Sequence, residues 1–134
     1  MPIDYEFLYS FSEQLLHFEK SIRLIGIANK YGVLLNVEHR DKLVPFMTEE
    51  ENEEYAANAV KRYKTRVKFQ TKIGNLNYAF GRYEKISRVT IPINQDYYLL
   101  FTLDADEKAY DDLIMNKIFP FIDKYREKFI LEDE

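Results

Sequence analysis

The sequence predicts an α+β domain in which helices flank a five-stranded, mainly antiparallel sheet. The 134 residues suit one domain, and their 46% hydrophobic and 31% charged content is that of a globular protein. The apolar residues alternate between helical and strand-like spacing in the order α-β-β-α-β-β-β-α. The links between successive strands are short, except for the one through the middle helix, and short links favour antiparallel pairing. We expect a single domain over residues 1–134, with its core at about 4–130.

The N-terminal third predicts a helix followed by a β-hairpin. We expect the helix to run roughly from Asp4 to Lys20. Its apolar residues recur at steps of three and four, as on one helix face: Leu8, Phe11, Leu15, Phe18 and Ile22. Residues 22–28 form a β-branched run typical of a strand. Asn29 and Gly32 bound a turn, and residues 33–38 make the return strand.

The middle helix has the clearest signals in the chain. Thr48 and Glu51 form a capping box, in which each side chain satisfies a backbone amide that the first helical turn leaves free. Acidic residues crowd the first turns and basic residues the later ones, which suits the helix dipole. The buried stripe is expected to comprise Ala56, Ala59, Val60, Tyr63 and Val67.

Three strands follow the break at Gly74 and Asn75. We expect them at residues 76–81, around 89–93 and at 97–102. Pro92 cannot donate a ladder hydrogen bond. We therefore expect either that the strand around residues 89–93 is at a sheet edge or that Pro92 lies near the end of this strand. Arg88 alternates with apolar neighbours and is expected to face outward.

The last helix is expected to start at a cap made by Asp104 or Asp106. Its apolar stripe includes Tyr110, Leu113, Ile114 and Ile118. Pro120 should kink the helix or begin a new turn. The acidic residues 132–134 are interpreted as a solvated tail.

The chain carries no recognisable catalytic machinery, and we expect no catalytic residue, metal or cofactor. It has no cysteine, which excludes thiol nucleophiles, disulfides and thiolate metal sites. The two histidines, His17 and His39, are interpreted as surface residues, since neither accompanies a nucleophile motif. The four glycines are too scattered for a phosphate-binding loop. The acidic runs at 49–54 and 104–112 lack the central glycine of a calcium loop.

Charge and apolar run lengths narrow the choice of partners. The net charge of −4 makes nucleic acid an unlikely partner. The basic residues between Lys61 and Lys72, with Tyr63 and Phe69 among them, could contact phosphates, but a solvated helix face accounts for them more simply. The apolar runs are too short for membrane insertion, and the N-terminus has no signal-peptide pattern, so we expect a cytoplasmic protein.

The segment from Ile22 to Gly32 is similar to the opening hairpin of a group of small uncharacterised archaeal proteins. Further residues stand where that group has them: Arg62, Arg66, Gly74, Tyr78, Arg82, Tyr83, Glu84, Lys85, Pro92, Leu99 and Leu100. The similarity covers roughly residues 20–115. The element order and this hairpin also resemble the roadblock/dynein-light-chain and longin-type domains, which share a profilin-like sheet.

The roadblock resemblance implies a non-enzymatic module that forms a homodimer and regulates or scaffolds small GTPases. In that family the middle helix and the third strand make the dimer interface, which correspond here to 48–69 and 75–83. The candidate contact residues are Tyr55, Ala59, Tyr63, Tyr78 and Phe80. The alternative is a small-molecule sensor domain of PAS or GAF type, which would need an aromatic-lined cavity.

Overall fold

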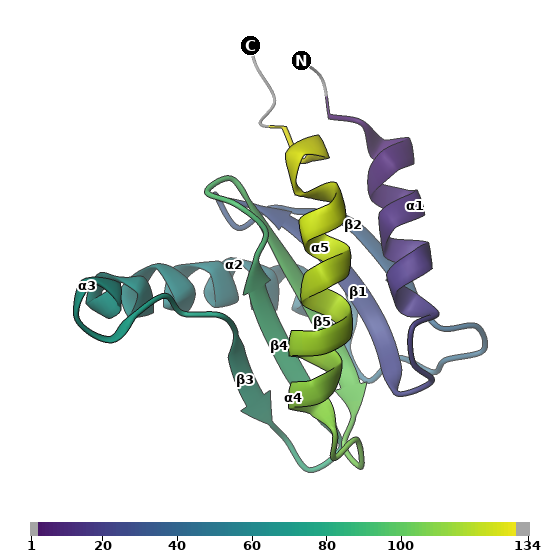
Figure 1. Cartoon of the computed structure of the whole chain (residues 1–134). Helices are drawn as coiled ribbons and strands as arrows, with labels where there is room; N and C mark the ends of the chain where they lie inside the picture. The colour runs from purple at the N-terminus through teal and green to yellow at the C-terminus, as the bar shows by residue number, and fades with distance from the viewer. Residues whose placement is uncertain (1–2, 131–134) are drawn as a thin grey trace.

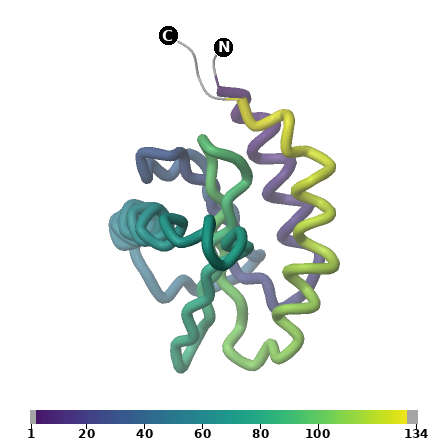
Figure 2. Tube along the Cα trace, turned by 60° about the vertical axis from the view of Figure 1, so that its left-hand side comes forward, coloured from purple at the N-terminus to yellow at the C-terminus, as the bar shows by residue number. Residues whose placement is uncertain are grey.

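The computed structural model describes residues 3–130 and places a sheet between two layers of helices (Figure 1, Figure 2). The strands are β1 (Ile22–Asn29), β2 (Leu34–His39), β3 (Ala79–Arg82), β4 (Ile86–Pro92) and β5 (Tyr97–Asp104). Their order in the sheet is β2-β1-β5-β4-β3, and every neighbouring pair is antiparallel. This arrangement confirms the five-stranded antiparallel sheet. The acidic tail at 132–134 lies outside the described residues.

One face of the sheet is covered by α1 (Tyr5–Leu16) and by the C-terminal helical segment (Figure 2). The core on this side is rich in aromatic rings. Phe11 is 1% exposed, and its ring centroid lies 4.9 Å from those of Phe121 and Phe129. The side chains of Ile25, Leu99 and Phe101 come from the sheet into the same cluster. The contacts join both ends of the chain over one sheet face.

The opposite face is covered by α2 (Glu49–Arg66), whose predicted capping box is present. Thr48 Oγ1 accepts a hydrogen bond from the Glu51 amide at 3.1 Å, and Glu51 Oε1 accepts one from the Thr48 amide at 2.9 Å. A 3-10 turn, η1 (Val67–Phe69), and α3 (Gln70–Ile73) extend the helix. The core on this side is smaller, and its buried members are Ala28, Ala56, Ala59, Val60, Tyr63, Tyr98 and Leu100.

The first helix is shorter than predicted. It ends at Leu16 because the chain tightens there: the His17 and Phe18 amides bond to the carbonyls of Gln14 and Leu15, three residues back. Ile22 therefore belongs to β1 and not to the helix. Phe18 and Ile22 still pack into the same core as the rest of the stripe, because strand and helix meet on one sheet face.

The prediction that Asp104 or Asp106 caps the last helix is wrong. Asp104 ends β5, and its carboxylate is 3.0 Å from Arg23 Nη1 and 3.2 Å from Arg40 Nη2. The helical segment begins after Ala109, whose amide donates to Glu107 Oε2 at 3.0 Å. The Asp104 carboxylate, which we expected to cap the last helix, therefore pairs with Arg23 and Arg40 instead.

The C-terminal helical segment consists of α4 (Tyr110–Leu113), a π-helical turn η2 (Ile114–Ile118), α5 (Phe119–Tyr125) and a 3-10 turn η3 (Arg126–Lys128). The π turn lies directly before Pro120. Proline has no amide to donate and its ring crowds the carbonyl four residues back, so the regular bond pattern is interrupted there. The predicted kink therefore takes the form of a widened turn.

The third strand is shorter than predicted, and β4 is not an edge. Residues 76–78 lie outside β3; the Leu76 amide donates to Gln70 Oε1 at 3.0 Å and the Leu76 carbonyl accepts from the Tyr63 hydroxyl. Pro92 is the last residue of β4, which agrees with the expectation that it lies near a strand end. It pairs with Tyr98 of β5, while pairing with β3 ends at Thr90, so no ladder bond is lost.

Candidate functional site

The free edge at β3 is one of two candidate functional regions. β3 has four residues and pairs only with β4, so its other side carries unpaired backbone groups. The third strand is therefore a sheet edge. In Figure 1, α2 runs behind the sheet, and α3 extends beyond β3. A partner at this edge would therefore meet a strand and a helix together.

The candidate contact residues of α2 lie beneath the helix. Ala59 and Tyr63 are buried against the sheet, where the Tyr63 ring centroid is 5.6 Å from that of Tyr98. Burial and the charge of Tyr98 raise the pKa of the Tyr63 hydroxyl, and burial raises that of Tyr98. Tyr55 is half-buried, with the guanidinium of Arg88 at 3.7 Å from its ring centroid. Ala59 and Tyr63 thus contribute to the core of this domain.

The candidate contact residues near β3 lie on the other face of the sheet. The Phe80 ring stacks on Tyr110 with centroids 4.1 Å apart. The Tyr78 hydroxyl donates to Asp111 Oδ1 at 2.5 Å. Burial, followed by this carboxylate, raises the pKa of Tyr78 to about 12. The five candidates therefore divide between two faces and do not make one surface.

Two large apolar side chains are exposed at the end of the helix that passes β3. Phe69 is 59% exposed and Ile73 is 84% exposed, and they are four residues apart. The outward-facing side of α2 carries acidic residues in its first half, including Glu54, and basic residues in its second, including Lys61. Hydropathy patterning alone did not indicate Phe69 or Ile73, because a helix end can bury or expose such residues.

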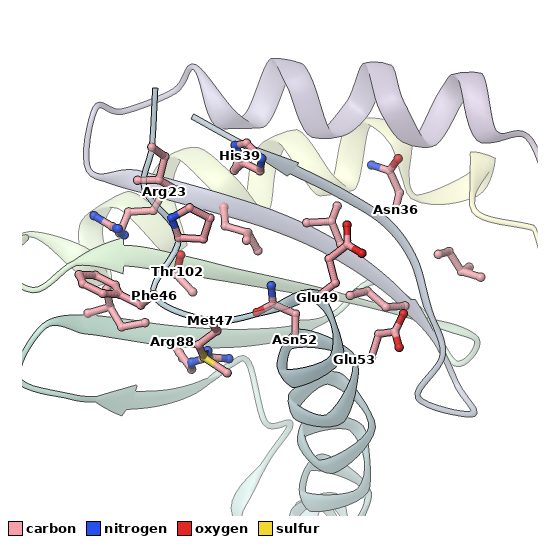
Figure 3. A pocket seen from close by; sticks show the side chains of 17 residues that line it. Arg23, Asn36, His39, Phe46, Met47, Glu49, Asn52, Glu53, Arg88 and Thr102 are labelled. Carbon is pink, nitrogen blue, oxygen red and sulfur yellow. The ribbon is translucent and has the colours of Figure 1, made fainter. Parts of the chain in front are cut away.

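The second candidate region is a half-open pocket of 460 Å³ on the α2 side of the sheet (Figure 3). Its floor is formed by strand residues, and one wall is the first turn of α2 with Glu49, Asn52 and Glu53. The other wall is residues 43–47, which we call the strap. Phe46 of the strap is 55% exposed, with the charged groups of Arg23 and Lys85 at 4.8 and 5.5 Å from its ring centroid.

Arg88 lies at the floor of this pocket, so the prediction that it faces outward is wrong. Its residue is 6% exposed, and its guanidinium donates to Met47 Sδ. Val89 and Ile91 point to the aromatic face, as their alternation indicates, and Arg88 points to the other face. That second face is covered by α2 and the strap. The alternation of polar and apolar residues in a strand does not indicate whether other segments cover the polar face.

The pocket exists because α2 covers only part of its sheet face. Directly opposed residues share a face, and one row crosses the sheet from β4 to β2: Arg88, Thr102, Leu24 and His39. All four line the pocket. The row beside it contains Leu100 and Gly26, and Gly26 lines a small apolar extension of 20 Å³ next to Arg88.

No arrangement of catalytic groups is visible within residues 3–130. No group of three or more histidine or acidic side chains there is placed to hold a metal ion. His17 Nδ1 is 2.7 Å from the Glu13 carbonyl oxygen, and His39 Nδ1 is 3.3 Å from that of Arg40. Both histidines therefore contact backbone, and neither is hydrogen-bonded to a hydroxyl nucleophile.

The helices of the described part of the chain were also compared with the requirements of a membrane span. None of those between residues 3 and 130 has both the length and the hydropathy to cross a bilayer.

The chain has the fold of roadblock/LC7 domains. A roadblock/LC7 domain from Streptomyces avermitilis superposes with a TM-score of 0.70 at 9% identity, over 96% of this chain and 98% of that one. MglB of Myxococcus xanthus gives 0.73 at 12% identity, over 95% and 98%. A structure described as MglB with a tetrameric arrangement gives 0.71 at 11% identity, over 96% and 89%. No family model and no curated protein sequence matches the chain.

Proposed function

We propose that this protein is a non-catalytic interaction module that forms a homodimer through β3 and the outer side of α2. The observations that carry the proposal are the free edge of β3 and the exposure of Phe69 and Ile73 on the helical segment that extends beyond it (Figure 1). Sheet edges and exposed apolar side chains are the features that a second chain covers. The tetrameric arrangement described for one MglB structure supports self-association in this fold.

The charges of α2 favour a second copy of this chain as the partner. In a two-fold pair of antiparallel helices, the acidic half of each faces the basic half of the other. Glu54 and Lys61 are both exposed on the outer side, close to the middle of the helix. Glu54 of each copy would therefore face Lys61 of the other copy across the two-fold axis.

This arrangement changes which residues make the contact. Ala59 and Tyr63 stay in the domain core, and Tyr78 and Phe80 stay against α4. The contact residues are instead Glu54, Lys61, Phe69, Ile73 and the free side of β3, with Tyr55 at the margin. The proposal thus keeps the two elements that the roadblock resemblance implies and replaces most of the candidate residues on them.

The test is sedimentation equilibrium at about 50 µM, where a micromolar dimer is mostly assembled. E54K and K61E each place like charges opposite one another twice, and we expect either to weaken the dimer about tenfold. An equimolar mixture of E54K and K61E restores opposite charges at both places and should dimerise like the unmodified chain. The exposed Lys20 follows α1, which packs on β1 and β2 away from β3, and K20E is the matched charge-reversal control.

A second variant tests the apolar part. I73D changes a side chain that is already in solvent, so folding should be unaffected while the dimer weakens about tenfold or more. A monomeric unmodified chain at this concentration would overturn the proposal. So would a mixture of E54K and K61E that stays as weakly associated as the single variants.

The wider role in the proposal is regulation of a small GTPase, as the roadblock resemblance implies. The absence of a nucleophile–base pair in the described residues and the fold of the compared structures support a role in binding and not in chemistry. Titration with purified small GTPases, loaded with GDP or with a GTP analogue, tests this part. If no small GTPase of the source organism binds measurably in either nucleotide state, the proposed regulatory role is contradicted.

A further inference from the structure

We infer that the pocket beneath the strap binds a small organic monocarboxylate, whose carboxylate pairs with Arg88 and whose apolar part packs against Leu24 and Leu34. This site is on the sheet face next to α2 and shares only Tyr55, at the margin of the proposed dimer surface, with that surface. It therefore goes beyond the proposed function and is tested separately from it.

The first argument is the charge state of Arg88. An arginine this deeply buried is normally paired with a carboxylate. Among residues 3–130, the ion pairs of the structure join other groups, and none includes Arg88. Its contacts are a thioether sulfur, which is a weak acceptor, and the face of Tyr55. The nearby Arg23 is different, because Asp104 already neutralises it.

The second argument is that Arg88 still has donors available. A guanidinium has five N–H donors, and among residues 3–130 Nη2 alone has a hydrogen-bond partner, Met47. No side-chain nitrogen in these residues is both fully buried and unpaired. The other nitrogens of Arg88 therefore keep some accessible surface, and Arg88 lines the pocket. A carboxylate there would accept two parallel hydrogen bonds, the geometry that a guanidinium favours.

The third argument is the shape and chemistry of the remaining wall. The volume of 460 Å³ lies in the ordinary range for small-molecule sites. Leu24, Leu34 and Leu35 give the pocket apolar lining, and the Asn52 amide and Thr102 hydroxyl add polar groups. A Cβ on residue 26 would come within 3.2 Å of Leu34 Cδ1, so a larger residue there would displace the Leu34 side chain of the pocket lining.

The acidic wall limits the charge of the ligand. Glu49 and Glu53 line the same pocket from the first turn of α2 (Figure 3). A second negative charge on the ligand would meet them in a half-enclosed site, where like charges repel more strongly than in water. One carboxylate with an apolar body therefore suits the site better than a dicarboxylate or a phosphate.

The experiment titrates the full chain with phenylacetate and follows amide shifts by NMR. We expect saturable shifts at Gly26, Asn52 and Thr102 with a dissociation constant of about 1 mM, typical of a ligand of this size. Phenylacetamide has the same shape without the charge and should bind about tenfold more weakly. The dianion phenylmalonate should also bind more weakly.

Two arginine variants identify the group responsible. R88M keeps an unbranched side chain, shorter than arginine, and removes its charge, and should weaken phenylacetate binding about tenfold. R62M is the matched control: Arg62 is exposed and also stacks on Tyr55, at 5.5 Å, but does not line the pocket. R62M should bind phenylacetate as the unmodified chain does. G26V should weaken phenylacetate binding by displacing the Leu34 side chain of the pocket lining.

The inference is overturned if phenylacetate and phenylacetamide give equal shifts, or if R88M binds as well as R62M. It is also overturned if about 10 mM phenylacetate moves no amide of the pocket. If R88M fails to fold, the comparison of phenylacetate, phenylacetamide and phenylmalonate on the unmodified chain still tests whether the site binds a single carboxylate. The dimer result leaves these outcomes unchanged, since Glu54, Lys61 and Ile73 are not part of the pocket.

Discussion

The two faces of the sheet are built differently, although the same strands form both. The face toward α1 and α5 is closed by large rings, with Phe7, Phe11 and Phe129 in mutual contact. The face toward α2 is closed by small residues and tyrosines, and only over part of its area. Large side chains build the thicker layer, while small ones bring a helix close and leave part of the face beside it as a pocket.

Replacing Phe11 by alanine should give the largest difference between the faces. The ring has four aromatic neighbours and almost no exposure, so we expect F11A to lower the free energy of unfolding by about 3–5 kcal/mol. V60A removes fewer atoms from the core on the α2 side and should cost about 2 kcal/mol. Urea denaturation measures both. Equal losses, despite the smaller deletion in V60A, would mean that the core on the α2 side contributes more per deleted atom than the aromatic core.

Gly32 lies in the turn of the first hairpin, next to Ala57 of α2. Its replacement tests how closely α2 packs against this turn. Residue 32 has a φ of 81°, and an added Cβ would come within 2.8 Å of Ala57 Cα. We expect G32A to cost about 3 kcal/mol from backbone strain together with displacement of the helix.

Gly74 is the control for this substitution. It also has a positive φ, of 91°, but nothing lies within 4 Å of the position of its Cβ. G74A should therefore cost about 1–2 kcal/mol, from strain alone. Thermal or urea unfolding compares the two variants, and a G74A loss as large as that of G32A would remove the argument for close packing at Ala57.

Glu38 should give the smallest effect, at the margin of the aromatic face. Burial, followed by the charge of Glu13, raises its pKa above the ordinary 4.5, although His39 and Asn36 oppose the shift. A raised folded pKa means that stability falls as pH rises from 4.5 through the folded value. E38Q should remove this loss and stabilise the protein at neutral pH by less than about 0.5 kcal/mol.

The measurement for Glu38 is the unfolding midpoint as a function of pH. The difference between E38Q and the unmodified chain should disappear below pH 4.5, where the carboxyl is protonated in both states. A difference that persists there would show that the amide acts through new contacts and not through charge.

Local signals account for the parts of the fold that were predicted. Thr48 and Glu51 define the start of α2 within four residues, and alternation at Val89 and Ile91 identifies β4. Asn29 and Gly32 likewise mark the hairpin turn, where Asn29 Oδ1 accepts from the Tyr31 amide at 2.9 Å. Each of these features depends on residues close in sequence, so one stretch of chain is enough to recognise it.

The errors come from contacts between distant segments. Asp104 was available as a helix cap, but Arg23 and Arg40, more than sixty residues away in sequence, bind its carboxylate instead. The candidate contact residues that the roadblock resemblance implies lie on α2 and in or next to β3, and the sides on which they point follow from how α2 and α4 pack on the sheet.

The sequence by itself determined the order of the elements, the turns and the cap of α2, because neighbouring residues decide backbone conformation. Only the tertiary structure decided that the face carrying Arg88 and Thr102 is covered, and that the cover leaves a pocket. Strand alternation separates two faces, but whether a polar residue on either meets water depends on helices and loops that arrive from elsewhere in the chain.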